Sequence, residues 1–253
     1  MYVNSFAFID SSVVKSHQTC QQKMQLEAQR IDPMQAGNNT GVLGRMRDIL
    51  KMQGLGVGAF SINANSISLI GDPGVSSSPM ILSDTGVTEF NRNPSQTNMS
   101  DIIADLNGQT TENSGLFGEL FSDELLTGLS HNQLMYDTLN GLDNLFVFPS
   151  DGLGRQLSTV SKMIATREQR GTDADVFFLS YGGWDTHSEV LDRQVRLFSR
   201  VDAAIDAFHR EMVEMGTWDN VVLIQTSDFA RTLSPNTGEG TDHAWGGNYF
   251  MTG

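Results

Sequence analysis

The sequence has little cysteine, no long apolar run and little positive charge, and each shortage argues against a class of protein. Cys20 is the only cysteine, so the chain can form neither an internal disulfide nor a site that needs several thiolates. No stretch approaches the roughly 20 apolar residues of a membrane-spanning helix, and residues 1–14 lack the pattern of a secretory signal. The formal net charge of −14 argues against the basic face that nucleic-acid binding requires. We therefore expect no membrane span, no signal peptide in this chain and no nucleic-acid partner.

The pattern of apolar residues predicts an α/β fold. Two short and almost wholly apolar runs, residues 176–179 and 221–225, are typical of strands buried on both faces of a parallel sheet. An amphipathic helix predicted from Ser188 to Met215 joins them into a βαβ unit. The chain of 253 residues is long enough for one such domain with a mostly parallel sheet. Because Gly, Pro, Ser, Asn and Thr dominate from Gly71 to Asn98, we expect a long loop or insertion near residues 71–114.

Other elements are predicted from helical or alternating spacing of apolar residues. Helices are expected at residues 16–30, 42–52, 99–106, 115–121, 131–142 and 153–168. A strand is expected from Ala59 to Ile70, and His131 is expected to be a capping or surface residue at a helix start. An apolar run begins at Tyr249 and would leave a strand at the edge of the domain, so we expect a truncated domain.

Three clusters of acidic residues and histidine follow these elements. Asp185 and His187 come after the first predicted strand, Asp228 comes after the second, and Asp242 and His243 lie in a later Gly-rich loop. The ends of parallel strands meet at one edge of a sheet, where ligands gather. A carboxylate beside an imidazole suits zinc, manganese or iron, and suits calcium less well because of the nitrogen. The clusters therefore predict a metal site.

The same residues also have a purely structural interpretation that needs no metal. Asp185 could cap the helix that follows it, and Arg231 could form a surface ion pair that contributes little to stability. In the functional interpretation, Arg231 donates hydrogen bonds to an oxygen of a phosphate or sulfate group. The metal interpretation requires the side chains of Asp185, His187, Asp228 and His243 to lie within ~5–6 Å of a common point.

The sequence around these clusters resembles the bacterial family named domain of unknown function 1501. The motifs that carry this resemblance are residues 177–187 (FFLSYGGWDTH), 226–233 (TSDFARTL) and 240–247 (GTDHAWGG). The resemblance implies a three-layer α/β/α sandwich like that of alkaline phosphatases and sulfatases. It also implies that members are exported, which would place the protein in the periplasm or outside the cell.

The resemblance further implies a divalent metal (zinc, manganese or calcium) held by Asp and His side chains at strand ends. Its ligands would be Asp185, His187, Asp228 and His243, with Asp242 in the same set. Two features depart from the superfamily pattern. Phe229 stands where phosphatases and sulfatases usually place a histidine ligand. The chain also has no opening strand with a Gly-Gly-x-Asp motif, so one acidic ligand would be missing.

Two functional hypotheses follow from these residues. The first is a metal-dependent hydrolase that acts on a small anionic substrate, a phosphate or sulfate ester. Ser16, at the start of a predicted helix, would be its nucleophile and Arg231 would orient the substrate, although Ser16 could equally be a helix N-cap. The second is a non-catalytic extracytoplasmic binding or surface protein that keeps the fold, or an inactive fragment.

Overall fold

The structure is a computed structural model that describes residues 5–10, 40–90, 99–108, 115–227 and 229–253, with only the backbone described at 5–10 and 100. The chain divides into two compact units. The first comprises residues 1–85 and 143–253, and the second comprises residues 86–142.

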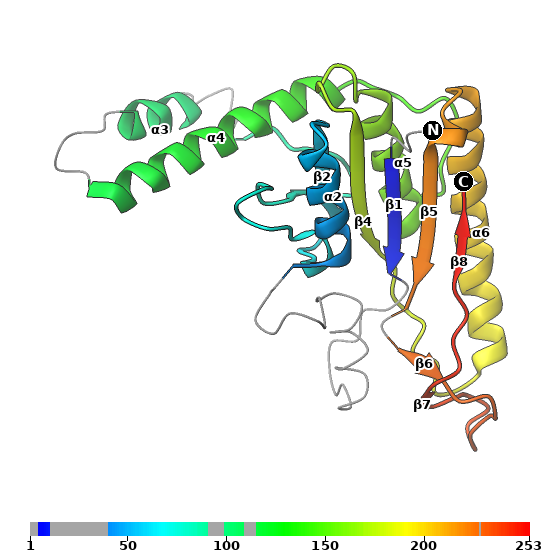
Figure 1. Ribbon diagram of the computed structural model, residues 1–253. Helices are drawn as coiled ribbons and strands as arrows, with labels where there is room; N and C mark the ends of the chain where they lie inside the picture. The colour runs from blue at the N-terminus through cyan, green and yellow to red at the C-terminus, as the bar shows by residue number, and fades with distance from the viewer. Residues whose placement is uncertain (1–4, 11–39, 91–98, 109–114, 228) are drawn as a thin grey trace. The chain divides into compact units, whose positions relative to one another are not determined.

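A six-stranded sheet forms the centre of the first unit, in the order β3-β2-β4-β1-β5-β8 (Figure 1). Its strands are β1 (Ser5–Asp10), β2 (Val57–Ile62), β3 (Met80–Leu82), β4 (Ala174–Ser180), β5 (Val221–Thr226) and β8 (Phe250–Thr252). All neighbouring strands are parallel except the antiparallel pair β5 and β8. Asp10 in β1 is level with Ser180 in β4 and Thr226 in β5, so the three central strands end at one edge of the sheet.

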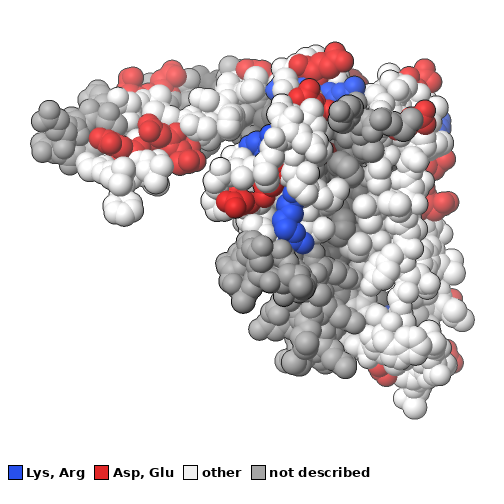
Figure 2. All heavy atoms as spheres, viewed as in Figure 1, with Lys and Arg blue, Asp and Glu red and all other residues white. Residues whose placement is uncertain are grey.

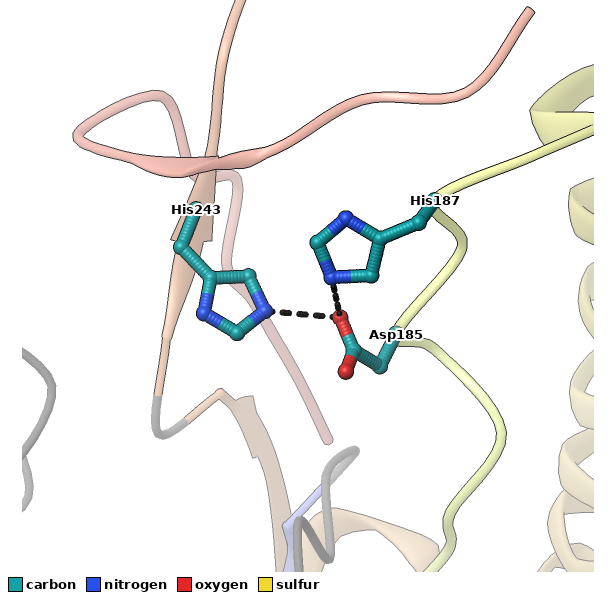
Figure 3. Close-up of side chains that lie close together, drawn as sticks. All are labelled: Asp185, His187 and His243. Carbon is teal, nitrogen blue, oxygen red and sulfur yellow. Dashed lines mark hydrogen bonds and ion pairs between the residues drawn. The ribbon is translucent and has the colours of Figure 1, made fainter. Parts of the chain in front are cut away.

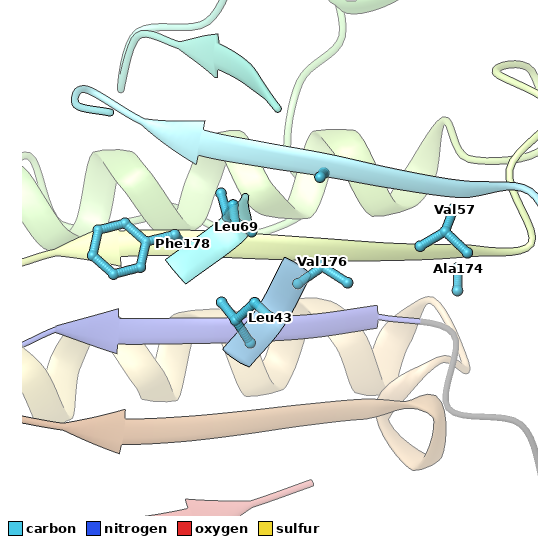
Figure 4. Close-up of a cluster of buried hydrophobic side chains, with 7 residues drawn as sticks. Leu43, Val57, Leu69, Ala174, Val176 and Phe178 are labelled. Atoms are coloured by element: carbon cyan, nitrogen blue, oxygen red, sulfur yellow. The ribbon is translucent and has the colours of Figure 1, made fainter. Parts of the chain in front are cut away.

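Helices cover both faces of this sheet. Figure 4 shows α5 (Gly152–Ala165) and α6 (Val190–Glu214) behind the strands, and α2 (Val42–Met52) with the short 3₁₀ helix η1 (Ile67–Leu69) in front. A second 3₁₀ helix, η2 (Trp218–Asn220), leads into β5. The predicted three-layer α/β/α sandwich with a mostly parallel sheet is therefore confirmed.

The two core layers follow from the alternation of side chains along β4. Val176 and Phe178 face α2 and pack with Leu43 and Leu69 in one buried cluster (Figure 4). Phe177 points to the opposite face and is fully buried. This double burial explains why the sequence of β4 is apolar at almost every position, as in other parallel sheets with helices on both sides.

In the second unit, α3 (Met99–Asn107) packs against the long helix α4 (Gly115–Leu139). The prediction of two separate helices at residues 115–121 and 131–142 is wrong, because one helix runs through both. Between them only Gly128 disfavours a helix, and a glycine in a helix interior costs about 1 kcal/mol, too little to break it. His131 is exposed as expected, but it lies within α4 and does not begin a helix.

Two predictions about strands are corrected by the structure. The chain does have a strand near its start, β1, which lies in the middle of the sheet, although its sequence SFAFID contains no Gly-Gly-x-Asp motif. The strand predicted from Ala59 to Ile70 ends at Ile62, because Asn63 has a positive φ of 67° and the chain then enters η1. The helix predicted at residues 16–30 lies outside the described residues.

The other predicted helices and strands agree closely with the structure, whereas the long loop expected near residues 71–114 contains β3 and α3. The helix at 42–52 has the predicted bounds, while α5, α6, β4 and β5 differ from their predictions by a few residues at the ends. The apolar run after Tyr249 forms β8 at the edge of the sheet. None of the helices within the described ranges is long and apolar enough to cross a membrane. On the face seen in Figure 2, acidic groups are scattered and the described residues form no broad basic patch.

Candidate metal centre

Three side chains of metal-binding type meet beyond the edge where the central strands end: Asp185, His187 and His243 (Figure 3). The Nε2 atoms of His187 and His243 lie 2.9 and 2.7 Å from the same atom, Oδ1 of Asp185. One ligand atom from each residue lies within 4.8 Å of the other two. These three residues meet the distance requirement for a shared ion.

The fold places these residues through two segments, one that follows β4 and one that follows β5, the strands on either side of β1. Asp185 and His187 lie in the segment between β4 and α6. His243 lies in β7 (His243–Ala244), which pairs with β6 (Ala230–Arg231) shortly after β5. Since β4 and β5 both flank β1, residues 56 or more positions apart in sequence come together at one edge of the sheet.

Gln156 of α5 fixes the point where the first of these segments leaves the sheet. Its side-chain oxygen accepts a hydrogen bond from the backbone N–H of Ser180 (3.2 Å), and its side-chain nitrogen donates to the Ser180 carbonyl (2.9 Å). Gln156 is itself buried. Gly183 then turns the chain with a φ of 103°, a conformation that favours glycine.

The helix-capping interpretation of Asp185 is wrong. The helix α6 begins at Val190 after the N-cap residue Glu189, whose side chain makes no capping hydrogen bond. The Asp185 carboxylate instead accepts hydrogen bonds at Oδ1 from Arg231 Nη1 (2.5 Å) and from His243.

Arg231 is not a surface residue, because its side chain is only 14% exposed. Besides its ion pair with Asp185, its Nε donates to Thr241 Oγ1 (2.9 Å) and its Nη2 donates to the Thr241 carbonyl. The planar guanidinium therefore joins the segment that holds Asp185 to the segment that holds His243. It also provides the positive charge nearest to the Asp185 carboxylate.

His187 lies between two carboxylates. Its Nε2 faces Asp185, and its Nδ1 is 2.9 Å from Oδ1 of Asp242. A neutral imidazole has one N–H and one lone pair, so it can donate to only one of the two carboxylates. A second proton on the ring would satisfy both contacts. A cation would do so as well, if Nδ1–H donates to Asp242 while Nε2 and Asp185 bind the ion, the arrangement common around metal-bound histidines. The donor set therefore fits a metal, with Asp242 supporting His187.

The local contacts keep both acids ionised. Burial by itself raises the pKa of Asp185, but hydrogen bonds from His243 and Arg231 and the charges of both histidines outweigh it, so the pKa lies below its ordinary value. Hydrogen bonds from His187 and Asn236 lower the pKa of Asp242 in the same direction. Both groups are thus in the form that attracts a cation.

Phe229 packs against the candidate ligand His243. Its ring stacks on that of His243 with centroids 4.7 Å apart, and the Arg231 guanidinium lies 5.4 Å from the centre of the Phe229 ring. Phe229 is buried. Phe229 therefore gives apolar support to one side of the His243 ring.

Two predicted site residues, Ser16 and Asp228, lie outside the described residues, so their roles stay predictions. Asp10 is a residue that the sequence reasoning missed. It ends β1 at the edge where the site lies, level with Ser180 and Thr226. The signal in the sequence is the apolar run Phe6–Ile9, which is followed directly by an acidic residue.

Comparison with protein families completes this description. The model of the family described as "Protein of unknown function (DUF1501)" matches residues 126–253, just over half of the chain. The chain belongs to this family. The match confirms the resemblance noted from the sequence, and it includes all three clustered residues together with Arg231 and Asp242.

Other comparisons add little. None of the curated proteins matches the chain. Among solved structures, a mutant of TAB5 alkaline phosphatase with Mg bound is similar, with a TM-score of 0.34 and 11% sequence identity. That similarity covers 99% of this chain and 86% of the phosphatase chain.

Proposed function

We propose that the chain is a metal-dependent hydrolase of phosphate or sulfate esters with a small anionic substrate. The observation that carries the proposal is the meeting of Asp185, His187 and His243 within 4.8 Å at the edge where parallel strands end. Sites at this edge are the usual place for ligands in open α/β sheets. An ion held by these three residues and by Asp228, the proposed fourth ligand, would keep a position for water or substrate by becoming five-coordinate.

Each residue has a proposed role. Asp185, His187 and His243 hold the ion, with Asp228 as a fourth ligand and Asp242 orienting His187. Arg231 donates to a non-bridging oxygen of the ester, and Ser16 is the proposed nucleophile. When bound, a divalent ion would polarise the ester and activate the nucleophile.

The chemistry of the ligands narrows the choice of metal. Two imidazole nitrogens and one carboxylate oxygen favour zinc or manganese over calcium, which prefers six to eight oxygen ligands. We also propose export to the periplasm or the outside of the cell, from the family resemblance. Cell fractionation would test the location: finding the full-length protein in the cytoplasm would refute it.

A second function is favoured by one specific observation. Phe229 stacks on His243 at the position where the enzymes that the sequence resembles place a ligand. A protein with this substitution could keep the fold and an ion without hydrolysing esters. A non-catalytic binding protein is therefore the alternative that the assays must separate from the hydrolase.

The test combines metal binding with hydrolysis. The purified protein should bind zinc or manganese at about one ion per chain in calorimetry, and the metal-loaded protein should hydrolyse an aryl phosphate or an aryl sulfate. Asp185→Asn should abolish both binding and hydrolysis. The matched control is Asp206→Asn on α6, whose exposed carboxylate lies 3.8 Å from Arg210.

The outcomes separate the two functions. Metal binding with hydrolysis that depends on Asp185 supports the hydrolase. Metal binding without hydrolysis of either ester favours the binding protein. If the wild-type chain binds no divalent metal, or if Asp185→Asn binds as tightly as wild type, the proposed site is refuted.

A further inference from the structure

Residues 236–241 lie along the backbone of residues 186–190, directly behind the candidate ligand His187. The backbone N–H of Thr241 donates to the Thr186 carbonyl (3.1 Å), and the N–H groups of residues 189 and 190 donate to the carbonyls of residues 238 and 239 (3.2 and 3.0 Å). Gly240 is so close to His187 that a Cβ at position 240 would overlap its backbone. The two segments thus form one tightly packed layer behind the site.

Asn236 organises this layer with all of its side-chain atoms. Its Oδ1 accepts from the backbone N–H groups of Gly238 (2.9 Å) and Gly240 (3.0 Å). Its Nδ2 donates to the His187 carbonyl (3.1 Å) and to Oδ1 of Asp242 (3.1 Å). Two N–H groups face the oxygen and two acceptors face the nitrogen, so the orientation of the amide is unambiguous.

The two hydrogen bonds donated by Asn236 Nδ2 act on the same candidate ligand, His187, at its backbone and at its ring. The first holds the backbone of His187, and the second holds the carboxylate that accepts from the Nδ1 of the same histidine. Asp242 is more than half exposed, and without this bond its carboxylate could turn toward solvent. The distance between the His187 backbone and the Asp242 carboxylate is therefore set by Asn236, and that distance decides where the imidazole points.

We infer that Asn236 is a positioning residue of the metal centre, which acts through Asp242 to aim the Nε2 atom of His187 at the ion. The inference rests on the proposed function only in requiring that the site binds a metal. Groups that support metal ligands in this way usually contribute about 10- to 100-fold to metal affinity.

Two substitutions separate positioning from simple support of the loop. Asn236→Ala removes both halves of the amide. Asn236→Asp keeps an acceptor for the two glycine N–H groups but replaces the donor with an oxygen that repels Asp242. Asn144→Ala is the matched control, since Asn144 is also half-buried and also bonds through both amide atoms, to Ser158 of α5.

The measurements are zinc affinity by calorimetry, the visible spectrum of the Co²⁺-loaded protein, and the melting temperature without metal. The affinity is measured at high ionic strength, which screens the attraction between the ion and the negative charge that Asn236→Asp adds. We expect zinc affinity to fall about 10- to 100-fold in both Asn236 variants, with an altered Co²⁺ spectrum, and to stay within about twofold in Asn144→Ala. Asn236→Asp should keep a melting temperature closer to wild type than Asn236→Ala does.

A double-mutant cycle tests the route through Asp242. If Asn236 acts through that carboxylate, adding Asn236→Ala to Asp242→Ala should lower zinc affinity little further. Fully additive losses, or wild-type affinity and spectrum in Asn236→Asp, would overturn the inference while leaving the proposed metal site standing. Tight metal binding without ester hydrolysis would refute the hydrolase and not this inference. A wild-type chain that binds no metal would refute both.

Discussion

Replacing Gly240 by alanine should separate the two segments that form the back of the candidate site. An alanine Cβ at this position would lie under 3.0 Å from the carbonyl carbon and oxygen of His187 and from the N atom of Ser188. All three are backbone atoms, so no side chain can rotate to make room. The residue 236–241 segment must therefore move away from the segment that carries Asp185 and His187.

The size of the effect follows from the hydrogen bonds between the two segments. Three backbone bonds join them, from the N–H groups of Thr241, Glu189 and Val190. Each contributes ~1 kcal/mol net, so losing all three would lower the free energy of unfolding by about 3 kcal/mol. The same movement would draw Asp242 away from His187, so metal affinity should fall with stability.

Urea denaturation of the metal-free protein and zinc calorimetry measure these two effects. Gly152→Ala is the matched control, because Gly152 lies in the first turn of α5 with open space around its Cβ position. This control should leave stability unchanged or raise it by about 0.5–1 kcal/mol. If Gly240→Ala is as stable as wild type and binds zinc equally well, the close packing of the two segments is not required, and the reasoning is refuted.

Three further predictions concern buried charge, metal removal and pH. Asp175→Ala leaves Arg170 buried without its carboxylate and should destabilise the fold by about 3–5 kcal/mol in urea denaturation; a loss under 1 kcal/mol would contradict this. Removing the metal with a chelator should lower the melting temperature, because an ion at about 100 times its Kd stabilises by about 2.7 kcal/mol; an unchanged melting temperature would count against the site. The pKa values of Asp185 and Asp242 are lowered by folding, so stability from their ionised forms is present above the unfolded-state pKa of ~3.9 and is lost as pH falls through the folded-state values. The unfolding free energy of metal-free Asp185→Asn should thus decline less than that of wild type below about pH 4, and equal declines would refute the argument.

Local sequence determined most of the secondary structure wherever the apolar residues followed one clear periodicity. The helix at 42–52 and the strands β4 and β5 were predicted nearly at their observed bounds, because burial on one side of a helix or both sides of a strand leaves a clear pattern. The strand β1 was missed although its apolar run, Phe6–Ile9, is as long as the run 176–179 that predicted β4. The later run was recognised because an amphipathic helix and a second apolar run follow it, which together form a βαβ pattern. The central place of β1 depends on pairing with β4 and β5, which lie more than 150 residues later in the chain.

The sequence by itself determined which chemical groups the site contains. Asp185 and His187 were identified as metal-binding types from their position after an apolar strand, and Asp242 and His243 from their place in a later Gly-rich loop. The family followed from the motifs around these residues. The sequence could not assign different roles to two aspartates of the same chemistry.

Tertiary structure alone decided those roles, because they depend on contacts across 46 to 58 positions of the chain. The sheet brings His243 to the same oxygen of Asp185 that His187 faces, whereas Asp242 meets the far nitrogen of His187. Asn236 had no signal in the sequence, since an asparagine in a polar loop is ordinary. Its importance appears only when the loop folds back on His187 and the amide finds four partners.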